Sequence, residues 1–178
     1  MKRTFAILLT LMMLFSVTAY AESTGTQAAS IQQITFDETS APYEGGWLTF
    51  DDDGFMLYIP SDWVDVDVTD EMLDAGTYYA ASSADGAWGM TVSYSQDAGA
   101  TSNDDLAAQL TDAGYENVTQ LNVNGIDIVG YDITEQNVSG VAFLDSEGAL
   151  YVISFTPADD EAFAVIGQTI IMSLSPME

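Results

Sequence analysis

The sequence predicts an α+β fold in which helices pack against an antiparallel β-sheet. Short segments rich in β-branched and aromatic residues are joined by tight turns, which is the pattern of strands and hairpins. Two other segments repeat apolar side chains at helical spacing between capping residues. The order is strands, helix, four strands, helix, and this grouping is typical of an antiparallel sheet covered by helices.

The first 21 residues have the three parts of a secretory signal peptide. Lys2 and Arg3 precede an apolar run from Phe5 to Val17, which ends in the small-residue segment Thr18-Ala19-Tyr20-Ala21. As a helix the apolar run would span about 20 Å, too short for a bilayer core of about 30 Å, and this length disfavours a retained membrane anchor. We expect cleavage after Ala21 and a secreted, extracytoplasmic protein. The absence of cysteine excludes a lipoprotein anchor.

The rest of the chain is expected to form one tail and one domain. Residues 22–41 are rich in Ser, Thr, Gln and Ala, and we expect a flexible N-terminal tail with one short strand near Ile31–Phe36. Residues 42–178 are expected to form a single α+β domain. No disulfide can form, so the core alone must hold this domain together.

The first half of the domain is expected to consist mainly of strands. Residues 47–50 and 55–59 form the first expected hairpin, because an Asp-Gly step lies between them and Pro60 ends the second strand. The alternating segment 64–68 follows. A helical turn at 70–75 and a hairpin with strands 77–82 and 87–94 complete this half.

The second half contains the two helices. We expect a helix over residues 101–114, with Ser102 as its N-cap and Gly114 in the left-handed position that ends it. Two hairpins follow, with strands at 118–123 and 126–133 and then at 138–144 and 149–155. The last helix is expected to open at Thr156-Pro157, with Thr156 as N-cap, and to pack its apolar face on the sheet.

The charge of the chain limits its partners. The two basic residues, Lys2 and Arg3, lie in the expected signal peptide, whereas all 28 acidic residues follow Ala21. The mature chain therefore has a formal charge of −28 and cannot form a side-chain salt bridge. Nucleic acid and anionic membranes are excluded as electrostatic partners because both need Lys or Arg. Cations, basic peptides and neutral ligands remain, and solubility is the alternative role of the charge.

The missing residue types also remove most catalytic chemistry. Without His, Cys or Lys there is no ordinary catalytic triad, thiol nucleophile or Schiff base. Carboxylate chemistry survives, but the Asp-Thr-Gly and Asp-Ser-Gly triplets of aspartic proteases do not occur. We expect a protein that is not an enzyme and assign no catalytic residue. A carboxylate-dependent hydrolase such as a glycosidase is the alternative.

Two features are candidates for a binding site. Asp51-Asp52-Asp53-Gly54 can offer oxygen ligands to Ca²⁺, but the EF-hand pattern fails at Phe55, so a solvated turn is favoured. We therefore assign no cofactor and no metal ligand, and weak divalent cation binding stays open. Trp47 and Trp63 are expected in the core, and Trp88 is expected to be the exposed aromatic side chain.

The hydrophobic pattern resembles the PsbP-like fold family. The resemblance rests on Phe55-x-x-x-Ile59-Pro60-x-x-Trp63, on the strand Tyr151-Val152-Ile153-Ser154-Phe155 and on the ending Ile171-Met172-Ser173-Leu174. This family is known from the extrinsic PsbP subunit of photosystem II and from a Ran-binding nuclear import factor. The resemblance covers most of residues 46–175 and implies a small bacterial binding or assembly module. The photosynthetic role does not carry over, because the basic and histidine side chains that this member uses are absent here. The nuclear role does not carry over either, because a secreted bacterial protein would not meet the GTPase that this member binds.

These observations together predict a secreted, acidic, non-enzymatic binding or interaction module. Its expected partner is an extracytoplasmic protein, peptide or glycan. The ligand and the oligomeric state stay open.

Overall fold

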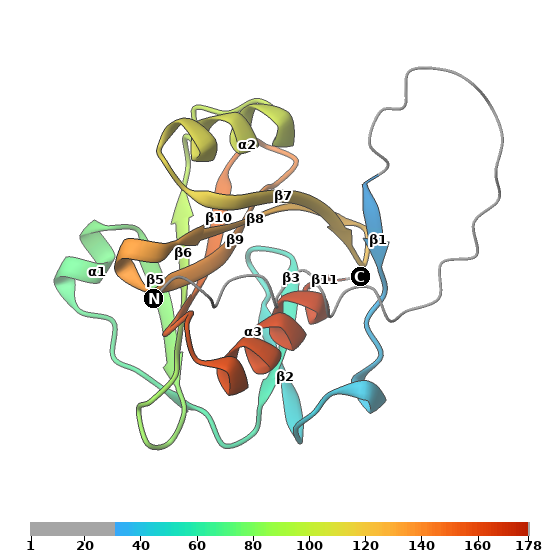
Figure 1. The fold of residues 1–178 in the computed structure, drawn as a ribbon, viewed down its shortest axis with the longest axis vertical. Helices are drawn as coiled ribbons and strands as arrows, with labels where there is room; N and C mark the ends of the chain where they lie inside the picture. The colour runs from blue at the N-terminus through green and yellow to red at the C-terminus, as the bar shows by residue number, and fades with distance from the viewer. Residues whose placement is uncertain (1–30, 178) are drawn as a thin grey trace, which may run out of the picture. The chain divides into compact units, whose positions relative to one another are not determined.

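The structure is a computed structural model and describes residues 31–177. The expected signal peptide and residues 22–30 of the expected tail lie outside the described residues. The described residues form eleven strands. Figure 1 shows α2 and α3 on opposite sides of β7 and β8. The elements are β1 (Gln32–Ile34), η2 (Glu38–Ser40), β2 (Gly45–Phe50), β3 (Phe55–Pro60), β4 (Val64–Asp65), α1 (Asp70–Asp74), β5 (Thr77–Ser82), β6 (Gly89–Ser95), α2 (Asn103–Asp112), β7 (Glu116–Val123), β8 (Ile126–Ile133), η3 (Thr134–Gln136), β9 (Val138–Leu144), β10 (Leu150–Thr156), α3 (Glu161–Ser173) and β11 (Ser175–Pro176).

Eight strands form one large sheet in the order β1-β7-β8-β9-β10-β6-β5-β4, and the other three form a small sheet in the order β11-β3-β2. All pairings are antiparallel except that of β1 with β7. The predicted α+β class, with a mostly antiparallel sheet and packed helices, is confirmed. The separate small sheet was not predicted, because sequence alternation identifies strands without showing which sheet they join.

Both faces of the large sheet are covered, and successive residues of its central strands belong to different faces. On β8, Ile128 packs toward α3 and the small sheet, whereas Val129 packs toward α2. The same alternation separates Val141 from Ala142 on β9. A two-residue period with apolar side chains on both sides explains why these strands read as continuous hydrophobic runs.

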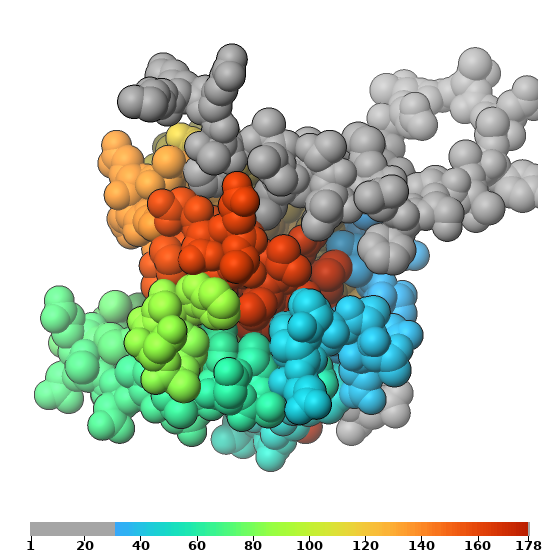
Figure 2. Space-filling view, turned by 60° about the horizontal axis from the view of Figure 1, so that its bottom comes forward, coloured from blue at the N-terminus to red at the C-terminus, as the bar shows by residue number. Residues whose placement is uncertain are grey.

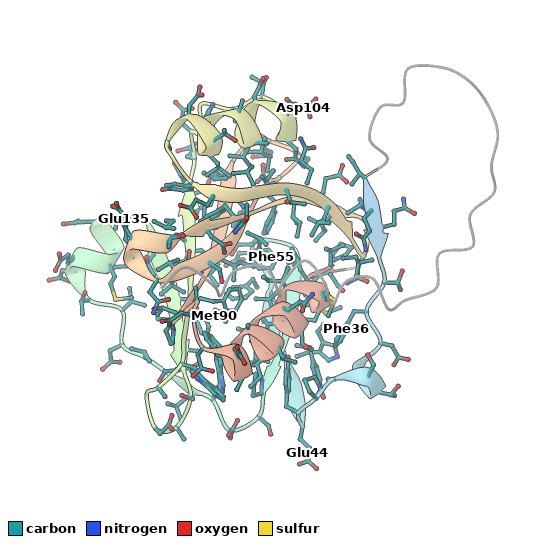
Figure 3. The ribbon with its side chains drawn as sticks, viewed as in Figure 1. Phe36, Glu44, Phe55, Met90, Asp104 and Glu135 are labelled. Carbon is teal, nitrogen blue, oxygen red and sulfur yellow. The ribbon has the colours of Figure 1, made fainter. Side chains whose placement is uncertain are left out.

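The larger core lies between the large sheet, the small sheet and α3. Phe55 is 2% exposed, and its ring stacks on Phe50 with a centroid distance of 4.7 Å. It also contacts Phe143 and Tyr151 edge-on, at 5.4 and 5.5 Å. Figure 3 shows Phe55 in the middle of the molecule beside α3, whereas Glu44, Asp104 and Glu135 lie at its periphery. Burying one such ring stabilises the fold by about 1.5–3 kcal/mol.

The two short helices follow the predicted capping rules. Ser102 Oγ accepts the backbone N–H of Asp105 at 3.2 Å, and Gly114 has φ +85°, so the predicted cap and end of α2 are confirmed. Thr69 caps α1 in the same way, through the N–H of Met72 at 3.3 Å.

The predicted start of the last helix is wrong. Thr156 still belongs to β10, where it pairs with Gly89, and α3 begins at Glu161. Its N-cap is Asp160, whose Oδ1 accepts the N–H groups of Ala162 and Phe163, each at 2.9 Å. A carboxylate that accepts two backbone N–H groups caps a helix better than a threonine four residues earlier, and it also suits the positive end of the helix dipole.

The strand predicted near Ile31–Phe36 is confirmed as β1, and it ties part of the predicted tail to the domain. Ile34 pairs with Val123, and the N–H of Asn124 donates to Ile34 O at 2.9 Å. The side chain of Asn124 accepts the N–H of Phe36 at 2.8 Å. From Gln32 onward, the chain is therefore held on the edge of the large sheet.

Candidate functional site

Among residues 31–177, the carboxylates have only neutral hydrogen-bond donors. The described residues contain 26 of the 28 acidic side chains and no Lys, Arg or His. All but four of them (Asp53, Asp132, Asp145 and Asp160) are exposed. Within residues 31–177, no buried side-chain nitrogen or oxygen lacks a hydrogen-bond partner. The buried polar side chains of this part of the chain therefore have hydrogen-bond partners, and the uncompensated negative charge lies at the surface.

Asp53, from the predicted candidate turn, faces two tyrosines. Its Oδ2 accepts the hydroxyl of Tyr78 and its Oδ1 that of Tyr151, both at 2.9 Å. Burial raises the pKa of both tyrosine hydroxyls, and the hydrogen bond to Asp53 raises it further. The carboxylate thus joins the β2–β3 hairpin to β5 and β10 of the large sheet.

This contact changes the interpretation of the Asp51–Asp53 turn as a cation site. Only Asp51 and Asp52 project freely into solvent, because Asp53 is half-buried and hydrogen-bonded through both oxygens. Among the described residues, no group of three or more acidic side chains is arranged to hold a metal ion. Two adjacent exposed carboxylates supply fewer oxygens than the six to eight that Ca²⁺ takes.

The structure reverses the predicted order of tryptophan exposure. Trp47 is 40% exposed, although it was expected in the core. Its indole N–H donates to Glu38 at 3.2 Å, and its ring meets Tyr58 edge-on with a centroid distance of 5.4 Å. Trp88, expected to be exposed, is half-buried and stacks on Phe163 at 5.5 Å. The cause is α3, which covers Trp88 and leaves the outer face of β2 open.

Trp63 was also expected in the core, and this is where the structure places it. It is half-buried and packs on Phe163 with a centroid distance of 6.1 Å. Trp63 and Trp88 therefore pack on the same helix from two strand ends.

Asp132 is the most buried acidic side chain that the structure describes, at 6% exposure. Burial raises the pKa of this carboxyl, and the negative charge of Glu116 opposite it on β7 adds to the effect. The amide of Asn117 donates to Asp132 Oδ2 at 2.6 Å and partly opposes the shift. At 6% exposure, Asp132 presents little surface to a ligand.

The most strongly acidic surface segment was not assigned as a site from the sequence, because the EF-hand pattern that starts at Asp65 lacks the required glycine at Asp70. We call residues 62–74 the acidic edge; they comprise β4, α1 and the link between them. Six carboxylates lie within these 13 residues: Asp62, Asp65, Asp67, Asp70, Glu71 and Asp74. All six are exposed. Figure 2 shows the green segment around α1 at the surface of the molecule.

The acidic edge also exposes apolar side chains. Val64, Val66 and Leu73 are 50%, 41% and 54% exposed. β4 is the last strand of the large sheet, so one of its sides has no partner strand. Valine and aspartate alternate over residues 64–67, and this alternation signalled a strand in the sequence. Whether that strand is central or at an edge is not encoded locally, so its exposure was not foreseen.

The comparisons with known proteins identify the fold and no more. No protein-family model matches the chain, and no curated protein matches it significantly. Among solved structures, the chain is similar to cyanobacterial PsbP (CyanoP) from Synechocystis sp. PCC 6803, whose structure was determined in solution. The two are 15% identical, the match covers 74% of this chain and 92% of that chain, and the TM-score is 0.51.

This likeness confirms the resemblance drawn from the hydrophobic pattern. The fold is PsbP-like. Separately, none of the helices that the structure describes is long and apolar enough to cross a membrane.

Proposed function

We propose that this PsbP-like protein is a secreted, non-enzymatic module that binds a basic partner, a protein or peptide rich in lysine or arginine, outside the cytoplasm. The observation that carries this proposal is the uncompensated acidic surface: exposed carboxylates with no cationic side chain among the described residues. Export is proposed from the signal-peptide pattern of residues 1–21.

The charge distribution supports binding more than solubility alone. A soluble surface usually mixes both signs of charge, whereas this one carries a single sign and concentrates it on the acidic edge. Single-sign surfaces attract oppositely charged partners over about a Debye length and accelerate their association. Valines exposed beside the carboxylates add the apolar area that a charged surface alone does not supply.

The alternative is a hydrolase with two catalytic carboxylates, such as a glycosidase. Such an enzyme needs a general acid with a raised pKa that reaches the scissile bond. Asp132 has the raised pKa, but it is 6% exposed and bonded to Asn117. The burial of Asp132 argues against a catalytic role. Incubating the purified protein with a panel of glycosides tests whether it is a hydrolase. Turnover that disappears in Asp132→Asn or Glu116→Gln would establish the alternative.

The composition of the chain suggests a direct experiment for the binding function. Carbodiimide couples carboxylates to amines, and residues 22–178 contain carboxylates but no lysine. Side-chain cross-links therefore form only between this protein and the lysines of a partner. We expect a lysine-rich peptide with an acetylated N-terminus to be coupled, and acetylated glutamate-rich and neutral peptides of equal length to remain free.

Affinity measurements at two salt concentrations complete the test. We expect the affinity for the lysine-rich peptide to fall between about 50 and 300 mM NaCl, because salt screens exposed charges. No affinity for any basic peptide at the lower salt concentration would contradict the proposed function.

A further inference from the structure

We propose that the open side of β4 binds an extended, lysine- or arginine-containing segment of another protein as an additional strand of the large sheet. This inference rests on the proposed function and specifies where and how the basic partner binds. In this mode, main-chain hydrogen bonds provide affinity and alternate side chains provide specificity.

The hydrogen bonds of β4 identify the backbone groups that face outward. Val64 and Asp65 pair with Ser82 and Ala81 of β5, and the N–H of Val66 donates to Ala80 O at 2.9 Å. In a strand, successive backbone groups point to opposite sides. β4 itself ends at Asp65, and the N–H of Val66 still donates to β5, so the N–H and C=O groups of Asp65 are directed away from the sheet. In the proposed complex residues 66 and 67 extend the strand, which places the backbone groups of Asp67 on the same outer side as those of Asp65. They are the groups that an added strand would pair with.

The side chains beside these groups define what the added strand must present. Val64 and Val66 lie on one face of the strand, whereas Asp65 and Asp67 lie on the other. The Asp65 carboxylate is held in place, because the hydroxyl of Tyr79 donates to its Oδ1 at 2.8 Å. Neighbouring strands place side chains of the same face about 5 Å apart. A segment that alternates apolar and basic residues therefore matches both faces at once.

Charge selects this occupant over a second copy of the chain. An exposed edge strand can pair with the same edge of another molecule, and carboxylates on the edge oppose that pairing by repulsion. Two acidic edges brought together would oppose twelve like charges with no cation in between. The residues that prevent self-association therefore favour a cationic strand.

The other edge strands are β1, β2 and β11, and they lack this combination. β11 contributes only Ser175 and Pro176. β1 begins after the exposed Ile31, but residues 31–36 contain no carboxylate. β2 exposes Trp47, with Glu44 as the nearest acidic residue before it along the chain. β4 alone among these edges alternates exposed apolar and acidic side chains.

The test uses the mature protein and a ten-residue peptide that alternates lysine with valine. We measure its affinity by calorimetry and compare it with the same peptide carrying N-methyl groups on alternate backbone amides, which prevent strand pairing. We expect the methylated peptide to bind about tenfold more weakly. In the wild-type protein, the amides of Asp65 and Asp67 should become protected from hydrogen exchange when the unmethylated peptide binds.

Two variants of one residue separate charge from strand pairing. Asp67→Asn removes the charge and keeps the backbone N–H, whereas Asp67→Pro removes both. We expect Asp67→Pro to bind about tenfold more weakly than Asp67→Asn. The double variant Asp112→Asn/Glu135→Gln, which neutralises exposed carboxylates on α2 and η3, is the control and should bind like wild type. The hydrogen-exchange measurement does not depend on the folding of any variant.

Each outcome has a distinct meaning. Strand addition would be overturned if the methylated and unmethylated peptides bound with equal affinity, or if Asp67→Asn and Asp67→Pro lost the same amount of affinity. Either result would leave the proposed function intact. Failure of every basic peptide to bind would overturn the proposed function itself. A dimer in sedimentation, with the amides of Asp65 and Asp67 protected in the absence of peptide, would show that a second copy occupies the edge and would overturn the proposal.

Discussion

At the scale of single residues, one carboxylate joins the two sheets through two tyrosines. Asp53 accepts hydroxyls from Tyr78 and Tyr151 at 2.9 Å each. A hydrogen bond to a charged group contributes about 1.5–3 kcal/mol to stability. We expect Tyr78→Phe and Tyr151→Phe each to lower the free energy of unfolding by about 1 kcal/mol, the lower value reflecting partial exposure of the carboxylate. Urea denaturation would measure this.

The control for these variants is Tyr94→Phe. Tyr94 is 40% exposed and its ring packs on Tyr151 at 5.2 Å, so the change removes a hydroxyl without breaking the contact with Asp53. Its stability should equal that of wild type. Tyrosine variants as stable as Tyr94→Phe would mean that the Asp53 contact adds nothing to the fold.

For Asp132 we predict a substitution that raises stability, whereas the tyrosine substitutions lower it. Burial raises the pKa of this carboxyl, so the charged form is unfavourable in the folded state at neutral pH. Asp132→Asn keeps an oxygen that can accept from Asn117 and removes the charge. We expect the variant to have a higher Tm than wild type at pH 7 and a smaller difference near pH 4. A lower Tm at both pH values would show that the carboxylate is needed for its hydrogen bond.

The sequence predicted little at this scale. It identified Asp51–Asp53 as a turn but not Tyr78 and Tyr151, which lie 25 and 98 residues from Asp53. Partners this far apart are brought together only by the packing of the sheets, so no local pattern encodes them. The wrong assignments of Trp47 and Trp88 have the same cause.

At the scale of elements, Asn124 connects three parts of the fold. Its backbone has φ +48°, its Oδ1 accepts the N–H of Phe36, and its Nδ2 donates to Met172 O and Leu174 O at 2.9 and 2.8 Å. The residue therefore closes the β7–β8 hairpin and also holds the start of the domain and the end of α3.

Replacing Asn124 separates its backbone role from its side-chain role. Asn124→Gly tolerates the positive φ but loses three hydrogen bonds, which should cost about 3 kcal/mol at about 1 kcal/mol each. Asn124→Ala also places a β-carbon in a left-handed conformation, which costs about 1 kcal/mol more. We expect stability in the order wild type, Asn124→Gly, Asn124→Ala by chemical denaturation. Equal stability of wild type and Asn124→Gly would show that the side-chain bonds contribute nothing.

Sequence reasoning succeeds best for elements whose signals are local. The cap of α2 at Ser102, the Asn124-Gly125 turn and the helical turn before Gly76 all depend on residues within a few positions of one another. The start of α3 was misplaced because Thr156-Pro157 and Asp160 both offer helix-start chemistry. Pairing of Thr156 with β6 decides between them, and that pairing is not local.

At the scale of the whole molecule, the pKa shifts predict how stability depends on pH. The pKa values of Asp37, Asp85, Asp105 and Asp160 are lowered by hydrogen bonds from neighbouring hydroxyl, indole and backbone groups. A lowered pKa contributes stability above the ordinary value of about 3.9 and loses it as the pH falls through the folded-state pKa. The raised pKa of Asp132 has the opposite effect, because it makes the folded state more stable as the pH falls toward 3.9.

We therefore expect the Tm to rise between pH 7 and about 4.5 and to fall at lower pH. As the pH falls through this range, the raised pKa of Asp132 favours the folded state, while the four lowered groups remain charged in both states. Thermal melts at constant ionic strength measure the profile, and Asp132→Asn should flatten its upper part. A Tm that falls steadily from pH 7 downward would contradict the prediction.

The uncompensated negative charge also predicts the effect of added salts. Salt should raise the Tm, because screening weakens the repulsion among exposed carboxylates in the compact chain. Since Asp53 is engaged by tyrosines, Ca²⁺, Mg²⁺ and NaCl at equal ionic strength should act alike apart from a small divalent excess. Melting curves with each salt test this. A saturable effect that is specific to Ca²⁺ would show that a dedicated site exists.

The burial of tyrosine hydroxyls has a consequence for acid–base titration. Five of them, on Tyr43, Tyr78, Tyr79, Tyr131 and Tyr151, have raised pKa values, chiefly because they are buried. The chain after Arg3 has no His, Cys or Lys, the other side chains that ordinarily titrate between about pH 6 and 10.5. The side chains of this protein therefore have almost no buffering capacity in neutral and mildly alkaline surroundings. Its electrophoretic mobility should stay nearly constant there, so its attraction for the proposed basic partner would change only when that partner itself titrates.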